Sequence, residues 1–377
     1  MTTLRRRVAA LNAHLVPSPM SSPPAAVEST AVFTAAERQQ FESEGMVILR
    51  GAVPPEICDA VAAEMFAFVG QDSSSPASWY RERPVGARRF TTVSSCDNTM
   101  LNMWGTQAMW DLRTQERIHR GMSELWGTEK LWVSIDTCDL KPPKTIAQPE
   151  WVKPLQLHTD LPEELITAWK RGELEPAQLA PRIQGVVYLA DTRENGGGFR
   201  CMPGFLPPLT DEWFASRDGA ECDFETIESS TSFTARTVSA NKGDMVIWNS
   251  YLPHGSGVNT AASPRMCQYV SMFPDPSCSG GSGTGGATCS ATELRETSAL
   301  WTDAEGNQKA STFGSADDPE EERRRRERMW RECLPQGSYT WPPLPPDDPR
   351  CAAELRPPEA AQLSPLGRRL LGIERWD

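Results

Sequence analysis

The sequence predicts a mainly β fold with flanking helices, an α+β class built as a barrel or sandwich of strands. Residues 155–160 alternate in polarity, so His158 and Asp160 point to the same face of an extended strand. A third candidate, His254, follows Asp160 by 254 − 160 = 94 residues, so several strands must intervene if the three side chains meet. The run 242–248 reads as a turn leading into an apolar strand that ends just before His254. Strands that fold back in this way hold distant side chains on rigid elements.

Two imidazoles and one carboxylate form the donor set that leaves open positions on a non-haem Fe(II) centre. The chain has four histidines, at positions 14, 119, 158 and 254, and two of them fall in this pattern. Each residue alone has a simpler interpretation: Asp160 as the N-cap of a helix beginning near 162–164, and His254 as a structural residue of its Pro/Gly-rich turn. Their order and spacing together predict a metal site of His158, Asp160 and His254.

Arg265 adds to this pattern, because it follows His254 by 265 − 254 = 11 residues and opens a predicted strand over 265–272. A guanidinium in that position presents a planar fork that binds a carboxylate through two parallel hydrogen bonds. The alternative for Arg265 by itself is a solvated strand end.

With these residues the sequence resembles the phytanoyl-CoA dioxygenase-like branch of the Fe(II)/2-oxoglutarate oxygenases. That family carries the His-x-Asp pair, the distal His and an Arg eleven residues later. Residues 33–51 resemble its N-terminal helix and first strand, and 187–204 its strand, glycine turn and following strand end. Phe205 and Leu206 depart from the Ser-His that many members have there. The resemblance covers roughly residues 31–274.

The resemblance implies a double-stranded β-helix (jelly-roll, cupin-like) barrel in which His158, Asp160 and His254 are the catalytic metal ligands of Fe(II). It also implies that 2-oxoglutarate chelates two further positions, that O2 takes the last, and that Arg265 binds the distal carboxylate of the cosubstrate. Ascorbate would serve as a reductant. The expected reaction is hydroxylation of an unactivated C–H in a small organic substrate, with release of succinate and CO2. Related halogenases have a small residue in place of Asp160, so its carboxylate favours hydroxylation.

Further polar and aromatic residues are candidates to line the cavity. The candidates for cofactor binding are Gln184, Ser134 and Trp248, and those for substrate binding are Gln156 and Arg200. The alternative for each polar residue is an ordinary inward side chain of a barrel. For Trp248 it is core packing, since the chain has 13 tryptophans.

Two other functions remain open: a non-catalytic ligand-binding barrel, and a metal enzyme on the same barrel that works without 2-oxoglutarate. Arg265 separates the second from the favoured hydroxylase, because it is the residue expected to hold the cosubstrate.

We expect four parts along the chain: a disordered tail (1–30), the oxygenase domain with N-terminal helices (31–275), a flexible Gly/Ser loop (276–292) and a helical, Pro-rich extension packed on the barrel (293–377). An organellar transit peptide is the alternative for the tail. Local patterns predict a capping box of Thr34 and Glu37, a helix from Pro55 to about Val69, and a third helical stretch over 104–126. They also predict a strand over 131–136, a candidate lid over 163–171, a solvated helix over 320–326 and a polyproline-like stretch over 341–346.

Composition limits the class of partner. The net charge of −12 argues against a nucleic-acid surface, which needs clustered Lys and Arg. No apolar run reaches the eighteen or so residues of a membrane helix. The ten cysteines lack a Cys-x-x-Cys pair and fit a reducing compartment, so we expect a cytoplasmic monomer or homodimer acting on a small molecule. Cys278 and Cys289, which flank the Gly-rich loop, are the one candidate pair.

Overall fold

The computed structural model describes residues 31–80, 99–101, 103–145, 155–160, 183–206, 228, 232–278, 319–333 and 359–376. The chain divides into two compact units, Met1–Ala31 and Val32–Asp377, and the elements named here all belong to the second. The predicted lid (163–171), the polyproline-like stretch (341–346) and Cys289 lie outside the described residues.

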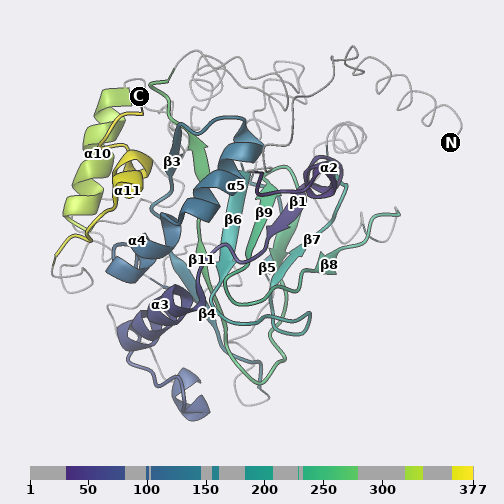
Figure 1. Ribbon diagram of the computed structural model, residues 1–377. Coiled ribbons are helices and arrows are strands. Elements are labelled where there is room, and N and C mark those ends of the chain that lie inside the picture. The colour runs from purple at the N-terminus through teal and green to yellow at the C-terminus, as the bar shows by residue number, and fades with distance from the viewer. Residues whose placement is uncertain are drawn as a thin grey trace, which may run out of the picture. The chain divides into compact units, whose positions relative to one another are not determined.

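Two antiparallel sheets carry the site (Figure 1). The larger contains six strands in the order β1 (Met46–Leu49), β9 (Met245–Asn249), β6 (Ile183–Tyr188), β11 (Arg265–Tyr269), β4 (Cys138–Lys141) and β2 (Met100–Leu101). The smaller contains four, in the order β5 (Leu155–His158), β10 (His254–Ser256), β7 (Phe199–Cys201) and β8 (Arg236–Thr237). A separate pair joins β12 (Met272–Pro274) to β3 (Leu131–Val133).

From β4 to β11 the chain passes from one sheet to the other at every step except between β7 and β8, which is the winding of a jelly roll. The strands β4, β6, β9 and β11 belong to the larger sheet, and β5, β7, β8 and β10 to the smaller. This topology confirms the predicted fold class. Of the two expected arrangements, barrel or sandwich, the described residues form the second, because no hydrogen-bonded strand pair joins the two sheets there. The sheets pack through side chains between their inner faces.

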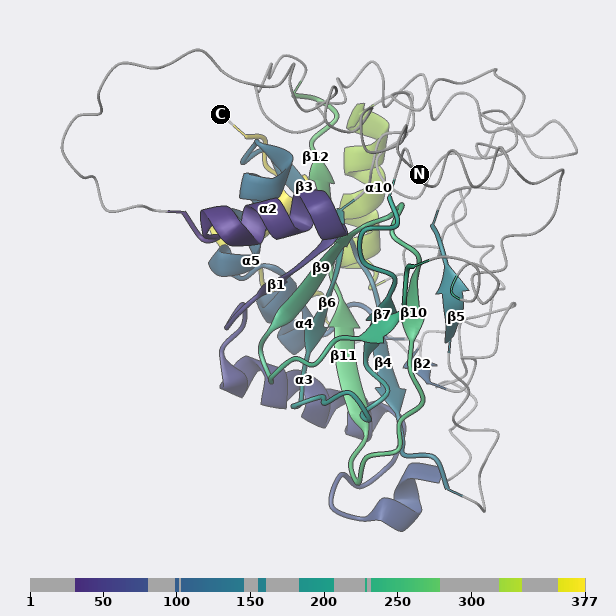
Figure 2. The same ribbon diagram turned by 90° about the vertical axis from the view of Figure 1, so that its right-hand side faces the viewer.

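The period of two along each strand separates two apolar layers. On β6 and β9, Val187 and Met245 belong to a cluster shared with the helices, whereas Val186 and Val246 belong to the cluster between the sheets. Figure 2 shows the smaller sheet on one side of the larger and the helices on the other. The inner layer therefore carries the site, and the outer layer fixes the larger sheet.

The helices are α2 (Ala35–Glu44), α3 (Pro55–Phe68), α4 (Gln107–Arg113), α5 (Glu116–Trp126), α10 (Pro319–Arg331) and α11 (Pro365–Leu371), with a 3-10 turn over Pro76–Tyr80. Within the described part of the chain, none of them is both long enough and apolar enough for a bilayer crossing.

Several local predictions are confirmed. Thr34 and Glu37 form the capping box of α2, with the backbone N–H of Glu37 on Thr34 Oγ1 and that of Thr34 on Glu37 Oε2 at 2.8 Å. The predicted turn before β9 is made by Gly243 at φ 84°, where an added Cβ would meet the carbonyl oxygen of Val53 at 2.3 Å. Glycine is required at that position by both conformation and space.

Two predicted elements are divided. The helical stretch over 104–126 breaks after Arg113, where the Thr114 hydroxyl donates to the carbonyl of Trp110 at 2.7 Å and a new helix starts at Glu116. Thr residues compete for backbone partners in this way. The strand over 131–136 ends at Val133, because β3 pairs with β12 whereas the next strand, β4, pairs with β11.

A helix forms over 320–326 as predicted, but the prediction that it is solvated is wrong for two of its arginines. Arg323 and Arg326 are buried on α10, and both guanidinium groups lie over the Trp132 ring, at 5.0 and 5.2 Å from its centroid. Arg326 donates to the carbonyls of Leu371, at 2.7 Å, and Val133, so one side chain joins α10, α11 and β3. Sequence spacing predicted surface ion pairs because it contains no information about which face docks on the strand pair.

We expect Arg326→Ala to destabilise the fold by about 3 kcal/mol, because buried carbonyls lose their charged donor. Arg328 is the matched control: it lies on the same helix with 67% of its side chain exposed and pairs with Glu332, so Arg328→Ala should change stability by less than about 0.5 kcal/mol. Urea unfolding measures both. Equal effects would show that Arg326 does not anchor the helix.

Candidate metal centre

Pairing between β5 and β10 brings the two imidazoles together. His254 and His158 are directly opposite partners in the antiparallel ladder, although 96 positions (254 − 158) separate them. Their ring centroids are 4.6 Å apart. Asp160 lies two residues beyond His158, past the end of β5, and its backbone N–H donates to Ser250 at 3.3 Å. The register of β5 with β10 therefore brings the predicted metal donors close together.

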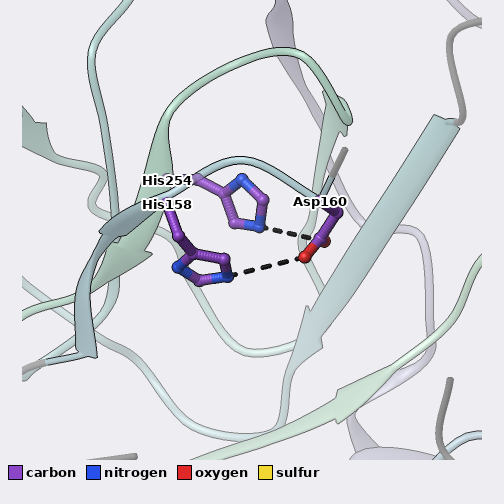
Figure 3. A group of neighbouring side chains, drawn as sticks. All are labelled: His158, Asp160 and His254. Atoms are coloured by element: carbon purple, nitrogen blue, oxygen red, sulfur yellow. Dashed lines mark ion pairs between the residues drawn. The ribbon is translucent and has the colours of Figure 1, made fainter. Parts of the chain in front are cut away.

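The three side chains converge (Figure 3). His158 Nε2 lies 3.6 Å from Asp160 Oδ1, and His254 Nε2 lies 3.4 Å from Asp160 Oδ2. One donor atom from each residue falls within 4.8 Å of the other two. Side-chain exposure is 39% for His158, 20% for Asp160 and 7% for His254, so the centre opens on the His158 side.

In both imidazole rings Nδ1, the nitrogen that does not face Asp160, lies within hydrogen-bond distance of a backbone carbonyl. His158 Nδ1 lies 3.0 Å from the carbonyl oxygen of Gln156, and His254 Nδ1 lies 2.8 Å from that of Leu252. A carbonyl only accepts, so Nδ1 must carry the proton and Nε2 keeps its lone pair. Such contacts orient metal-binding histidines and set their tautomer. Both Nε2 atoms are thus prepared for a metal.

The electrostatics favour the ligating protonation states. Burial disfavours the charged form of Asp160, but His254, His158 and a hydrogen bond from Gln184 outweigh it and hold the pKa of Asp160 well below its usual range. Burial and the nearby His254 lower the pKa of His158. An ionised carboxylate beside a neutral imidazole is what a divalent cation requires.

Aromatic rings form one wall of the centre. Trp248 and Phe199 lie 5.1 and 5.8 Å from the His254 ring by centroid distance, and the Phe199 ring is nearly parallel to it at 18°. The Trp248 ring also contacts Phe199 at 4.6 Å. Trp248 thus belongs to the buried core and borders the candidate metal ligand His254.

Gln184 also lies at the centre: its Nε2 donates to Asp160 Oδ2 at 2.7 Å. The structure does not bring three other candidates there. Ser134 is occupied by the backbone, since its hydroxyl accepts from Ser271 at 2.9 Å. The Gln156 side chain is exposed, and Arg200 lies on the outer face of β7 with Glu228 at 3.3 Å.

A second buried polar cluster surrounds Arg265. The side chains of Arg265 and Asp139 form an ion pair on neighbouring strands, with 2% and 4% of them exposed. Lys141, the strand partner directly opposite Arg265, donates to Ser256 Oγ at 2.6 Å. In the described part of the chain, Arg265 Nε and Asp139 Oδ1 are buried without a hydrogen-bond partner.

Sequence reasoning did not single out Asp139, Lys141 or Ser256. The signals were present: Ser256 lies two residues after His254, and Lys141 two residues after Asp139, so each pair shares a strand face.

Comparison with known proteins shows the family of the chain. A model of the family described as phytanoyl-CoA dioxygenase (PhyH) matches residues 41–267. The chain is similar to a putative phytanoyl-CoA dioxygenase of Dictyostelium discoideum, with 25% identity over 272 residues that cover 62% of this chain and 74% of that protein.

Two solved structures are similar in arrangement. The non-heme α-ketoglutarate-dependent carbocyclase SnoK from nogalamycin biosynthesis has a TM-score of 0.45 and 16% identity, and the match covers 64% of this chain and 85% of SnoK. HygX from Streptomyces hygroscopicus, solved with nickel and 2-oxoglutarate bound, has a TM-score of 0.43 and 14% identity, and the match covers 69% of this chain and 96% of HygX.

The family match spans more than half of the 377 residues, so the chain belongs to the phytanoyl-CoA dioxygenase family and is an oxygenase-type enzyme. The matched segment contains His158, Asp160, His254 and Arg265.

We expect His158→Ala and Asp160→Ala each to abolish Fe(II) binding, because each removes one of the three donors on which the metal would depend. His119→Ala is the control, since that ring stacks on Trp376 at 5.2 Å and its Nε2 contacts the carbonyl of Glu129 at 2.8 Å. Its metal content should match wild type. Equilibrium dialysis with Fe(II) under anaerobic conditions measures all three, and retained iron in Asp160→Ala would reject the site.

Proposed function

We propose that this protein is an Fe(II)- and 2-oxoglutarate-dependent dioxygenase that hydroxylates an unactivated C–H of a small organic substrate. His158, Asp160 and His254 would hold the metal, and Arg265 the distal carboxylate of 2-oxoglutarate. When bound, iron with 2-oxoglutarate and O2 supplies the oxidising power for hydroxylation, and succinate and CO2 are released.

The observation that carries this proposal is the relation between the two buried clusters. His254 and Ser256 lie two residues apart on β10, and both are buried. Two residues of antiparallel strand span about 7 Å. The metal donors and the Lys141–Ser256 contact are therefore separated by roughly the reach of a five-carbon diacid that chelates a metal with one end.

The second cluster also offers a donor for a carboxylate. Arg265 Nε is buried and has no hydrogen-bond partner among the described residues, so it could donate to an incoming carboxylate.

The chain's own residues then perform binding and exclusion of water. Nδ1 contacts keep both imidazoles in the ligating tautomer. The Asp160 carboxylate would occupy the position that a small residue leaves open in related halogenases. This favours hydroxylation over transfer of a halide. The aromatic wall of Phe199 and Trp248 keeps water from the His254 side of the centre.

The second candidate is a barrel that binds a metal without turning over 2-oxoglutarate. The ion pair of Arg265 with Asp139 favours it, because a guanidinium with a protein partner is already charge-matched. The buried Nε of Arg265, which has no hydrogen-bond partner among the described residues, favours the oxygenase instead, because it can donate to the carboxylate of the cosubstrate.

We expect the wild-type protein with Fe(II), ascorbate and O2 to release succinate from 2-oxoglutarate, and to do so faster once a substrate is found. Nuclear magnetic resonance of the succinate signal measures this directly. No succinate from a protein shown to hold iron would favour the second candidate.

Arg265→Lys should raise the KM for 2-oxoglutarate about 10- to 100-fold, since it keeps the charge opposite Asp139 but loses the two-pronged donor, worth roughly 1.5–3 kcal/mol. Lys is chosen over Ala so that Asp139 is not left as an unpaired buried charge. Iron affinity should stay within about twofold of wild type. An unchanged KM would contradict the assignment of Arg265 to the cosubstrate.

A further inference from the structure

Asp160 is the least constrained of the three ligands by its own backbone. His158 and His254 lie within paired strands, and their Nδ1 atoms have carbonyl partners. Asp160 lies two residues past the end of β5, outside the ladder, and its backbone N–H donates to the carbonyl of Ser250. The direction of its carboxylate therefore depends on side-chain contacts.

Gln184 supplies such a contact from a rigid strand. It lies on β6 directly opposite Trp248 of β9, is only 5% exposed, and donates through Nε2 to Asp160 Oδ2 at 2.7 Å. A hydrogen bond to an ionised acceptor is among the stronger kinds. The contact is therefore both well positioned and strong.

The orientation of the amide points to the same role. Gln184 Oε1 is buried and has no hydrogen-bond partner in the described structure. The reverse orientation would place that oxygen against the carboxylate of Asp160, where two acceptors repel. The Gln184 side chain thus leaves one atom unsatisfied while it makes the bond to Asp160.

We propose that Gln184 is a positioning residue for the metal-binding carboxylate, an inference that rests on the proposed function of the triad. Both carboxylate oxygens lie near an imidazole, Oδ1 at 3.6 Å from His158 Nε2 and Oδ2 at 3.4 Å from His254 Nε2. The Gln184 N–H occupies Oδ2 and lowers the basicity of that oxygen, so Oδ1 is the oxygen presented to the metal. Asp160 then binds through one oxygen and leaves more of the coordination sphere open for other ligands. Contacts of this kind typically change metal affinity 10- to 100-fold.

The chain offers a matched control in Gln268. That residue is also fully buried in the larger sheet, donates through Nε2 at 3.0 Å, and has an Oε1 without a partner among the described residues. Its acceptor is the carbonyl of Met109 on α4, on the helix side of the sheet. Gln184 and Gln268 thus share chemistry and burial and differ in what they contact.

The test compares Gln184→Met, Gln268→Met and wild type, since Met keeps the length of the side chain without the amide. Co(II) is the probe: its affinity is measured by calorimetry, and its visible absorption reports whether the carboxylate binds through one oxygen or two. Thermal unfolding of the metal-free proteins reports structural damage.

We expect Gln184→Met to weaken Co(II) binding about 10- to 100-fold and to alter the absorption spectrum. Gln268→Met should bind within about twofold of wild type with an unchanged spectrum, although both lower the metal-free melting temperature. Gln184→Asn, which keeps the amide but withdraws it by one methylene, should resemble Gln184→Met and serves if the latter does not fold.

Wild-type affinity and spectrum in the Gln184 variants would overturn the proposal, as would an equal loss of affinity in Gln268→Met. No step of this test uses 2-oxoglutarate. A wild-type protein that binds Co(II) but never turns over 2-oxoglutarate would reject the proposed function alone, and a protein that binds no Co(II) would reject both.

Discussion

The hydrogen-bonded pairing of β5 with β10 is the constraint on which the site depends. It places His158 opposite His254 across the smaller sheet, and Asp160 follows from the same strand. Because side chains alternate with a period of two, a slip of one residue in this register would turn His254 away from the other ligands. The strand register therefore brings the two histidines of the candidate centre together, and Asp160 follows just past the end of β5.

The same strand connects the centre to the cluster of Arg265, Asp139 and Lys141. His254 and Ser256 share a face of β10, and Ser256 receives the Lys141 ammonium from the larger sheet. Burying polar groups in an apolar layer costs free energy. The β10 strand fixes the distance between the two polar clusters, the candidate metal centre and the cluster around Arg265. The sandwich keeps them apart from the apolar cluster under the helices, which supplies most of the packing.

Sequence patterns predicted much of the site because its chemistry follows from residue type and local period. The His158–Asp160 spacing, the distal His254 and Arg265 all reach the inner layer, and the capping box at Thr34 forms as predicted. Such features depend on neighbours in the chain or on a ligand set that few arrangements satisfy. Ser134 lies away from the centre because it follows the end of β3, where its backbone N–H and its hydroxyl pair with the backbone of Ser271, a contact that no local pattern contains.

The sequence by itself determined the kinds of donor, their spacing within each strand and the mainly β class, since these follow from side-chain chemistry and the two-residue period. Only the tertiary structure decided what each charge faces. Arg265 meets Asp139. Arg326 reaches the carbonyls of α11 and β3 rather than water. These outcomes depend on which strands become neighbours after folding. Residues 139 and 265 are 126 positions apart in the sequence (265 − 139), and they are brought together by a register that no short stretch of sequence specifies.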